Sequence, residues 1–236
     1  MSATDRESHS DIIRVEWPDL VKFVRQLSHD LRNHLNAVEL QSAYLGELAS
    51  DPELKDEIKR LRQMTSELGA TLQKLSTGVA QPKPNLMPYP ANDYLEDLRK
   101  KVEADFPQEA SAIDWEVSAS EASIQIDPQL LQQAMLELFA NAFRHTRSEG
   151  KLKLQARVDG KQLVFALTEP KASFDLPTAQ WGRQPLRSIG QGHYGLGLNR
   201  VRLIVESLGG TLSAEYNKEA ATLVTTVTLP ADTKIG

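Results

Sequence analysis

Residues 26–36 read QLSHDLRNHLN and place a cluster of polar side chains inside an apolar helical repeat. Apolar side chains recur around this cluster at spacings of three and four, at Val21, Val24, Leu27, Leu31, Leu35 and Val38. This spacing predicts a helix that carries them on one stripe. His29, Arg32 and Asn33 then share another face, because residues three and four apart are neighbours on a helix surface. The carboxylate of Asp30 can set the tautomer of the adjacent imidazole and take up a proton.

A helical hairpin is predicted from this stretch outward. The first helix is expected from Asp11 to about Ala49 and the second from Glu53 to about Thr77, with Asp51 as a cap and Pro52 in the first turn. The second helix repeats apolar side chains at Leu54, Ile58, Leu61, Met64, Leu68, Leu72 and Leu75. Two such helices have apolar surface to spare, which predicts a homodimeric four-helix bundle. A scaffold hairpin without chemistry explains the apolar stripe equally well, but not the polar face around His29.

The rest of the chain is predicted to form a second domain. Residues 78–90, GVAQPKPNLMPYP, contain four prolines and cannot form a regular helix, so we interpret them as a linker. The predicted domains are a disordered leader at 1–10, the helical hairpin at 11–78, the linker at 79–90 and an α+β domain at 91–236. Within the α+β domain, helices are expected near 92–106, 128–146 and 196–208. Strands are expected near 113–117, 122–126, 151–158, 162–167, 211–216 and 221–229.

Composition excludes several classes of function. The 236 residues include 27 basic and 32 acidic side chains, a net charge of -5, which argues against general nucleic-acid binding. The absence of cysteine excludes disulfides, thiolate zinc sites and cysteine nucleophiles. No signal-peptide core and no apolar run near the roughly 18 residues of a membrane span are present. We therefore expect a soluble, cytoplasmic protein that receives any signal through a partner.

Two further motifs carry chemical information. Glu137 and Asn141 lie four residues apart in the helix predicted at 128–146, as do Asn141 and His145, so each pair shares a face. An acid and an amide one turn apart can hold a hydrated Mg²⁺ through oxygen atoms, and Arg144 can contact phosphates. The sequence GHYGLGL at 192–198 opens another helix, and its glycines let backbone amides approach a phosphate at the helix N-terminus.

Together these motifs resemble a two-component sensor histidine kinase core. Residues 28–33, SHDLRN, resemble the phosphoacceptor box, in which His29 takes a phosphoryl group on a ring nitrogen, Asp30 assists and Asn33 positions water. Residues 137–146 and 192–198 resemble the N-box and second glycine box of the GHKL (Bergerat) ATPase superfamily, an α+β sandwich. This resemblance implies ATP and Mg²⁺ as cofactors, with Glu137 and Asn141 as metal ligands. The nucleotide-binding residues that it implies are Glu137, Asn141, Arg144, His145, Glu169, Gly192, Gly195, Leu196 and Gly197.

One motif of that superfamily is degenerate. The family carries an Asp followed by two spaced glycines at the end of a strand, and that Asp binds the adenine amino group. Here Glu169 stands at the position of the Asp, and the sequence continues Pro170-Lys171-Ala172-Ser173 with neither glycine. Side chains at positions that need close backbone approach should obstruct the base pocket.

Three functions remain open at this point. The chain is an active protein-histidine kinase in which ATP phosphorylates His29, a phosphotransfer protein or pseudokinase with a vestigial nucleotide site, or a non-catalytic module that docks a response regulator. The resemblance implies a homodimer, a response-regulator receiver domain and an upstream sensor protein as partners.

Overall fold

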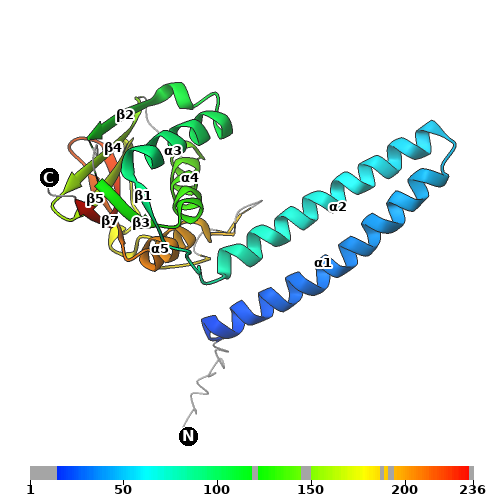
Figure 1. Ribbon diagram of the computed structural model, residues 1–236. Coiled ribbons are helices and arrows are strands. Elements are labelled where there is room, and N and C mark those ends of the chain that lie inside the picture. Colours follow the sequence, from blue (N-terminus) through cyan, green and yellow to red (C-terminus); the bar gives the residue numbers. More distant parts are fainter. Residues whose placement is uncertain (1–14, 119–121, 145–149, 187–188, 191–193, 234–236) are drawn as a thin grey trace, which may run out of the picture. The chain divides into compact units, whose positions relative to one another are not determined.

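The computed structural model describes residues 15–118, 122–144, 150–186, 189–190 and 194–233. The chain divides after Ala80 into two compact units, 1–80 and 81–236, coloured blue to cyan and green to red in Figure 1. The predicted leader at 1–10 lies outside the described residues. Within the described part of the chain, no helix combines the length and the apolar character that a membrane crossing requires.

The first unit is an antiparallel pair of long helices, α1 (Trp17–Leu48) and α2 (Pro52–Val79) (Figure 1). The predicted cap of α2 is confirmed, because Asp51 Oδ1 accepts a hydrogen bond from Glu53 N at 3.1 Å and Pro52 is in the first turn. Helix α1 is described from Trp17, with Glu16 in extended conformation as its N-cap. Pro18 suits this first turn, because the backbone N–H that proline lacks has no partner there.

The contact between α1 and α2 is narrower than the predicted apolar stripe. Its buried and half-buried positions include a line that recurs every seven residues, at Ser28, Leu35 and Ser42 on α1 and at Ile58, Thr65, Leu72 and Val79 on α2. The small hydroxyl side chains are satisfied within their own helices, as Ser42 Oγ and Thr65 Oγ1 donate to the Val38 and Leu61 carbonyls at 2.5 and 2.9 Å. Arg62 and Glu39 also pair across the two helices at 2.7 Å.

A second apolar line on the hairpin stays exposed. Its residues are Leu27, Leu31, Val38 and Leu45 on α1 and Leu54, Leu61, Met64 and Leu68 on α2, each between 39% and 62% accessible. We call this set the exposed leucine line. A run of apolar residues at spacings of three and four is wide enough to serve two contacts, and only part of the predicted stripe is used within one chain.

The second unit alternates helices and strands in the order expected for an α+β domain. Its strands are β1 (Met87–Pro90), β2 (Ile113–Ser118), β3 (Ala122–Ile126), β4 (Leu152–Asp159), β5 (Gln162–Pro170), β6 (Thr211–Asn217) and β7 (Thr222–Thr233). Its α-helices are α3 (Ala91–Asp105), α4 (Pro128–Arg144) and α5 (Gly197–Ser207), and short 3-10 turns lie at Ala110–Ala112 and Thr178–Gln180.

The strands form one mostly antiparallel sheet in the order β1-β3-β7-β5-β4-β2, with β6 also paired to β7 and β2 parallel to β4. Helices α3, α4 and α5 cover one face of this sheet (Figure 1). The core between the two layers contains Leu98 from α3, Phe139 from α4, Ile204 from α5 and Phe165 from β5, all nearly inaccessible to solvent. This two-layer arrangement confirms the predicted sandwich.

Two boundaries differ from the sequence expectation. The last four residues of the predicted linker form β1, which pairs with β3, and this edge position tolerates Pro88 and Pro90. Strand β5 continues through Pro170, because Glu169 and Pro170 pair with Leu223 and Thr222 of β7. This extension brings Glu169 into the sheet.

Candidate functional site

His29 lies on the outer surface of α1, and its side chain is 68% exposed. Its Nδ1 atom is 3.2 Å from Asp30 Oδ1 and 3.5 Å from Asn33 Nδ2. Gln26, one turn before Asp30, donates its side-chain amide to the same Oδ1 at 2.9 Å. The predicted polar cluster therefore forms, with Gln26 as a member that the sequence motif did not single out.

Asp30 determines which ring nitrogen of His29 carries the proton. Hydrogen bonds from Gln26 and then His29 lower the pKa of Asp30 below its ordinary value, so its carboxylate is ionised and can only accept hydrogen bonds. The contact with His29 Nδ1 is then satisfied by an Nδ1–H group. In that tautomer Nε2 carries the free lone pair, and no hydrogen bond to Nε2 is found among the described residues.

The imidazole of His29 and several basic side chains line one surface cavity of about 520 Å³ within the hairpin. Lys22, Arg25 and Arg32 line it together with His29, and Ser76 contributes from α2. The guanidinium of Arg32 is fixed by donation to Gln73 Oε1 across the two helices at 2.6 Å. His29 therefore lines the same cavity as three positively charged side chains.

The second cluster joins α4 to the N-terminus of α5. Asn141 Nδ2 donates to Glu137 Oε1 at 3.5 Å, which confirms that these side chains share a face of α4. The Glu137 carboxylate lies directly against Gly197, since a Cβ atom built on Gly197 would overlap it and approach Cδ to 2.8 Å. The positive end of the α5 dipole favours this carboxylate. Glu137, Asn141 and Gly197 therefore form one site, although they come from two helices.

Replacement of Gly197 by alanine should displace Glu137 because the new methyl group and the carboxylate would occupy the same space. We expect the free energy of unfolding of the second unit to fall by about 1–3 kcal/mol. The matched control is Gly69→Ala in α2, where a Cβ would meet nothing within 4 Å. That change should stabilise its helix by up to about 1 kcal/mol. Chemical denaturation of both variants measures the difference, and equal stabilities would contradict this role for Gly197.

The other predicted nucleotide-site residues are only partly brought together. Leu196 is buried and is the N-cap of α5, and Gly195 before it adopts a left-handed φ of 61° that favours glycine. Arg144 is the last residue of α4 and is exposed. His145 and Gly192 lie outside the described residues. Among the described residues, no group of three or more His, Asp or Glu side chains gathers in a metal-binding arrangement.

Glu169 is buried and forms an ion pair with Lys171, which stands at the position of the first missing glycine of the family motif. Its Oε2 atom lies 3.3 Å from Lys171 Nζ, and both side chains are 7% exposed. Along β5, Glu169 has the same parity as Leu163, Phe165 and Leu167, which belong to the core beneath the helices. The carboxylate thus points to the helical side of the sheet, where Lys171 neutralises it.

The backbone around Lys171 is held in place by the β6–β7 hairpin. Lys171 N donates to the Ala221 carbonyl at 2.7 Å, and Tyr216 Oη donates to the carbonyls of Lys171 and Ala172 at 3.2 and 3.1 Å. The ring of Phe174 then contacts both Tyr216 and Trp181 at 5.8 and 5.7 Å between centroids. The segment after β5 is therefore anchored on the sheet by contacts between residues distant in sequence.

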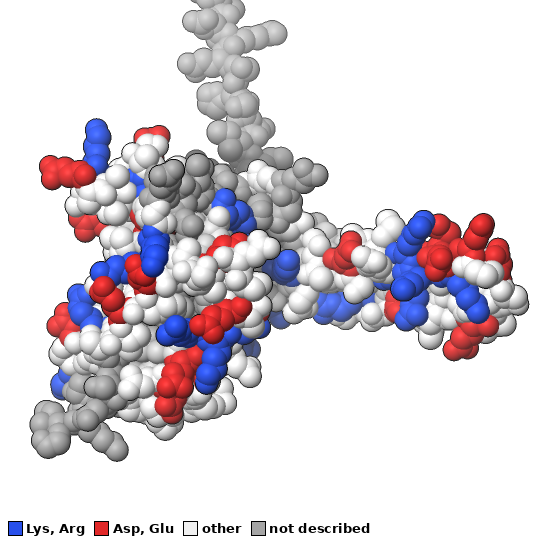
Figure 2. Space-filling model, turned by 90° about the horizontal axis from the view of Figure 1, so that it is seen from above, with Lys and Arg blue, Asp and Glu red and all other residues white. Residues whose placement is uncertain are grey.

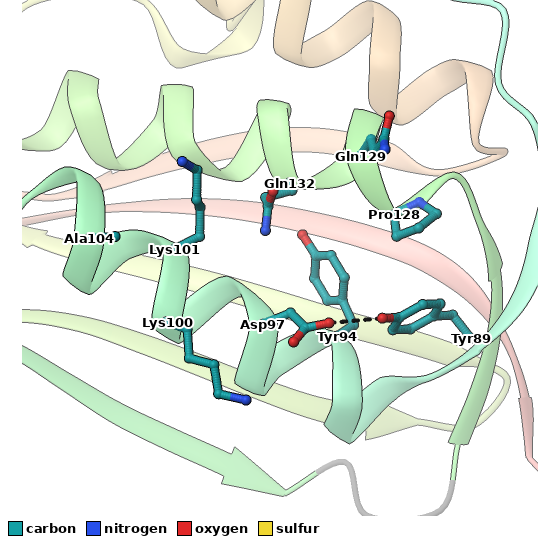
Figure 3. A pocket seen from close by; sticks show the side chains of 9 residues that line it. All are labelled: Tyr89, Tyr94, Asp97, Lys100, Lys101, Ala104, Pro128, Gln129 and Gln132. Atoms are coloured by element: carbon teal, nitrogen blue, oxygen red, sulfur yellow. Dashed lines mark hydrogen bonds between the residues drawn. The ribbon is translucent and has the colours of Figure 1, made fainter.

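A separate cavity of about 450 Å³ lies between α3 and the start of α4 (Figure 3). Tyr89 Oη donates to Asp97 Oδ2 there at 2.8 Å, while Lys100 and Lys101 pair with acids one turn away on α3. None of the predicted site residues lines this cavity. The buried hydroxyl of Tyr94, which also lines the cavity, has no hydrogen-bond partner among the described residues. We assign this cavity no function.

The comparison with known families addresses the second unit directly. Residues 126–233 match the family of histidine kinase-, DNA gyrase B- and HSP90-like ATPases. The relatives include an uncharacterised sensor-like histidine kinase, R01002, of Rhizobium meliloti, 23% identical over 227 residues that cover 89% of this chain. The chain has the organisation of a sensor histidine kinase core. This confirms the resemblance predicted from the motifs.

A further relative agrees with this assignment, and the chain covers only part of the length of each relative. The alginate biosynthesis sensor protein KinB of Pseudomonas aeruginosa is 23% identical over 206 residues, which cover 81% of this chain and 34% of that protein. R01002 is covered over 43% of its length. The chain thus spans less than half of the length of either relative.

Solved structures share the fold at low sequence identity. Full-length ShkA, crystallised in complex with AMPPNP, superposes with a TM-score of 0.66 at 20% identity, covering 91% of this chain and 47% of that one. The histidine kinase AdeS of Acinetobacter baumannii gives a TM-score of 0.51 at 20% identity, covering 86% of this chain and 97% of that one. These likenesses establish the fold of the histidine kinase core.

ATP, the cofactor implied by the ATPase family, fits one half of the site better than the other. Glu137, Asn141, Gly195 and Gly197 carry side-chain oxygens and backbone N–H groups of the kind that hold Mg²⁺ and phosphates. At the base end, Glu169 is already paired with Lys171. A base that donates an amino group finds no unneutralised carboxylate at this position. The residues present therefore do not fit the complete nucleotide.

Proposed function

We propose that the chain is a histidine-type phosphotransfer protein of two-component signalling, in which His29 exchanges a phosphoryl group with the aspartate of a response-regulator receiver. The observation that supports this most directly is the contact of His29 Nδ1 with an ionised Asp30. The contact leaves Nε2 as the basic nitrogen of an exposed imidazole.

The proposed step needs no additional reactant. The Nε2 lone pair of His29 attacks the phosphorus of the receiver's aspartyl phosphate, and an Nε2–P bond forms while the P–O bond to the aspartate breaks. The electron pair of that bond leaves with the aspartate as a carboxylate. The imidazole becomes positively charged, and its Nδ1 proton stays hydrogen-bonded to Asp30, whose negative charge stabilises it. The reverse step passes the phosphoryl group to a receiver.

The basic residues of the cavity support a doubly charged group at this place. Lys22, Arg25 and Arg32 lie around His29, and their charges favour the phosphoryl group on His29 as well as the acidic pocket of a receiver. Asn33 lies beside the ring at 3.5 Å, and we propose that its amide positions the water that removes the phosphoryl group. Because the cavity is open to solvent, a partner domain can reach Nε2.

We further propose that the hairpin forms a homodimeric four-helix bundle through the exposed leucine line. The line contains eight apolar residues per chain that one chain leaves partly exposed, and burying one such leucine contributes about 1.5–3 kcal/mol to association. The charged residues of the surface seen in Figure 2 are of both signs and interspersed, which favours protein partners over nucleic acid.

We also propose that an upstream sensor protein provides the input signal. The absence of cysteine is compatible with the reducing cytoplasm, which we propose as the location of the chain.

A second candidate function is autophosphorylation of His29 from ATP. The cluster of Glu137, Asn141 and Gly197 favours it, because these residues retain the metal- and phosphate-binding character of the family. The ion pair of Glu169 with Lys171 argues against autophosphorylation from ATP, because it neutralises the carboxylate that would accept a hydrogen bond from the base.

Two phosphoryl donors distinguish these functions. The purified chain is incubated either with γ-labelled ATP and Mg²⁺ or with a labelled, phosphorylated receiver domain. Label from the receiver but not from ATP is the result we expect. Label from ATP would make the second candidate correct, and a folded chain that takes label from neither donor would contradict both.

Asp30 should matter by positioning His29. Asp30→Ala removes the acceptor of the Nδ1–H group and should slow phosphotransfer about 100-fold. The ¹⁵N chemical shifts of the imidazole should show loss of the Nδ1–H tautomer, which a purely structural role would not change. Gln26→Ala, which removes only the neighbouring donor, is the matched control and should cost only a few-fold in rate.

The pH dependence of this contact follows from the sign of the pKa shift. The pKa of Asp30 is lowered from 3.8 by the Gln26 and His29 hydrogen bonds, so the contact is present above that value and lost as the pH falls through the lower, folded-state pKa. Between about pH 5 and 8 Asp30 should therefore stay ionised. A carboxylate that titrates in this range by ¹³C NMR would contradict the assignment.

A further inference from the structure

The buried pair of Glu169 and Lys171 lies at the end of β5, on the helical side of the sheet. A lysine is rarely buried this completely unless it is paired. Here the ammonium group and the carboxylate neutralise one another at 3.3 Å. The backbone on both sides of Lys171 is hydrogen-bonded to Ala221 and Tyr216, so its side chain is held in this direction by the sheet.

The ammonium group of Lys171 contacts Glu169 as the amino group of a bound adenine base would. A carboxylate at the end of this strand would accept a hydrogen bond from the exocyclic amino group of an adenine base, and the ammonium group of Lys171 is likewise a nitrogen donor, with a full charge. We propose that Lys171 is an internal occupant of the base-binding position. It neutralises Glu169 and fills the space of the base, so that the domain has lost selectivity for adenine while keeping the phosphate-side residues Glu137, Asn141 and Gly197.

Nothing in this proposal depends on phosphotransfer by His29, which belongs to the other unit of the chain. Its readout is the selectivity of ligand binding, and His29→Gln should leave that selectivity unchanged. Failure of the phosphotransfer assay and failure of the present inference are therefore separate results.

Titration calorimetry of the full chain with Mg²⁺ and three ligands tests the inference. The ligands are ATP, GTP and inorganic tripolyphosphate, which share phosphates but differ at the base. For the wild type we expect no preference for ATP, with any affinities equal to within about threefold. An ATP affinity tenfold or more above those of both other ligands would overturn the proposal.

Removal of the lysine should restore base recognition. Lys171→Gly opens the space and frees Glu169, and ATP affinity should then rise at least about tenfold relative to GTP. Lys218→Gly, in the exposed turn between β6 and β7, is the matched control and should not change selectivity. Lys171→Met keeps most of the side-chain volume without the charge, and it should not create an ATP preference.

The proposal can still be tested if Lys171→Gly is destabilised. Removing one partner of a buried ion pair leaves an uncompensated charge, so we expect Lys171→Gly to be less stable than the wild type. Glu169→Gln combined with Lys171→Gly removes that charge but keeps a side-chain oxygen that can accept from an amino group. If the folded single or double variant shows no gain for ATP over GTP, Lys171 is not an occupant of the base position.

Discussion

Replacement of His29 by glutamine should reduce phosphoryl transfer from a phosphorylated receiver to the background of a reaction without the chain. Glutamine keeps a polar side chain on α1 but has no basic nitrogen that can form a bond to phosphorus. The exposed position of His29 means that the fold should be almost unaffected, with a change in the free energy of unfolding within about 0.5 kcal/mol. Circular dichroism and a urea titration check this, and the transferred label measures the chemistry.

The chain provides a matched control for this substitution. His34 is also exposed on α1, and His34→Gln makes the same chemical change at a residue that does not line the basic cavity. Of the causes that lower the pKa of Asp30, the charge interaction with His34 is the smallest. The transfer rate of this variant should remain within about twofold of the wild type, because surface changes away from a site have small effects. If the two variants lose label equally, the phosphoryl group is not carried by His29 specifically.

A glutamate at Leu61 or Leu68 should dissociate the proposed dimer. Both leucines belong to the exposed leucine line, at 45% and 56% accessibility within one chain, so neither is needed to pack α1 on α2. In a symmetric bundle each substitution occurs twice. Each copy loses about 1.5–3 kcal/mol of apolar burial and adds a charge that association would have to desolvate. Light scattering of the wild type and variants at micromolar concentration should show a dimer and monomers, respectively.

The control for this experiment is Ser66→Glu, an exposed position on α2 outside both the contact with α1 and the exposed leucine line. It adds the same charge and should remain dimeric with an unchanged melting temperature. A Leu61→Glu variant that also stays a dimer of unchanged stability would contradict the bundle. A monomeric wild type would contradict it more directly.

Local features were predictable because they depend on short-range chemistry. The cap at Asp51, the hairpin around Asp159 and Gly160 and the shared face of Glu137 and Asn141 each follow from residues within four positions of one another. The polar cluster at His29 was predicted for the same reason. Gln26 was missed although it lies four residues before Asp30, where the spacing rule that linked the other members also applies.

Features that depend on tertiary contacts were not visible in the sequence. The apolar repeat of α2 gives Leu61 and Leu72 the same character, and only the position of α1 makes one exposed and the other part of the contact. The fit of Gly197 against Glu137 joins residues 60 positions apart. The missing glycine at Lys171 predicted obstruction of the base pocket, but the ion pair of Lys171 with Glu169 was not predicted because it depends on how β5 extends along β7.

The central claim is that His29 carries the phosphoryl group, and its most direct test is to locate that group. The wild-type chain is incubated with a phosphorylated receiver, digested at neutral to alkaline pH, and its peptides are sequenced by mass spectrometry. We predict a single phosphoryl group on the peptide that contains His29, lost on brief acid treatment because a bond from nitrogen to phosphorus is acid-labile. A phosphoryl group that survives acid, or one on any peptide without His29, would contradict this account.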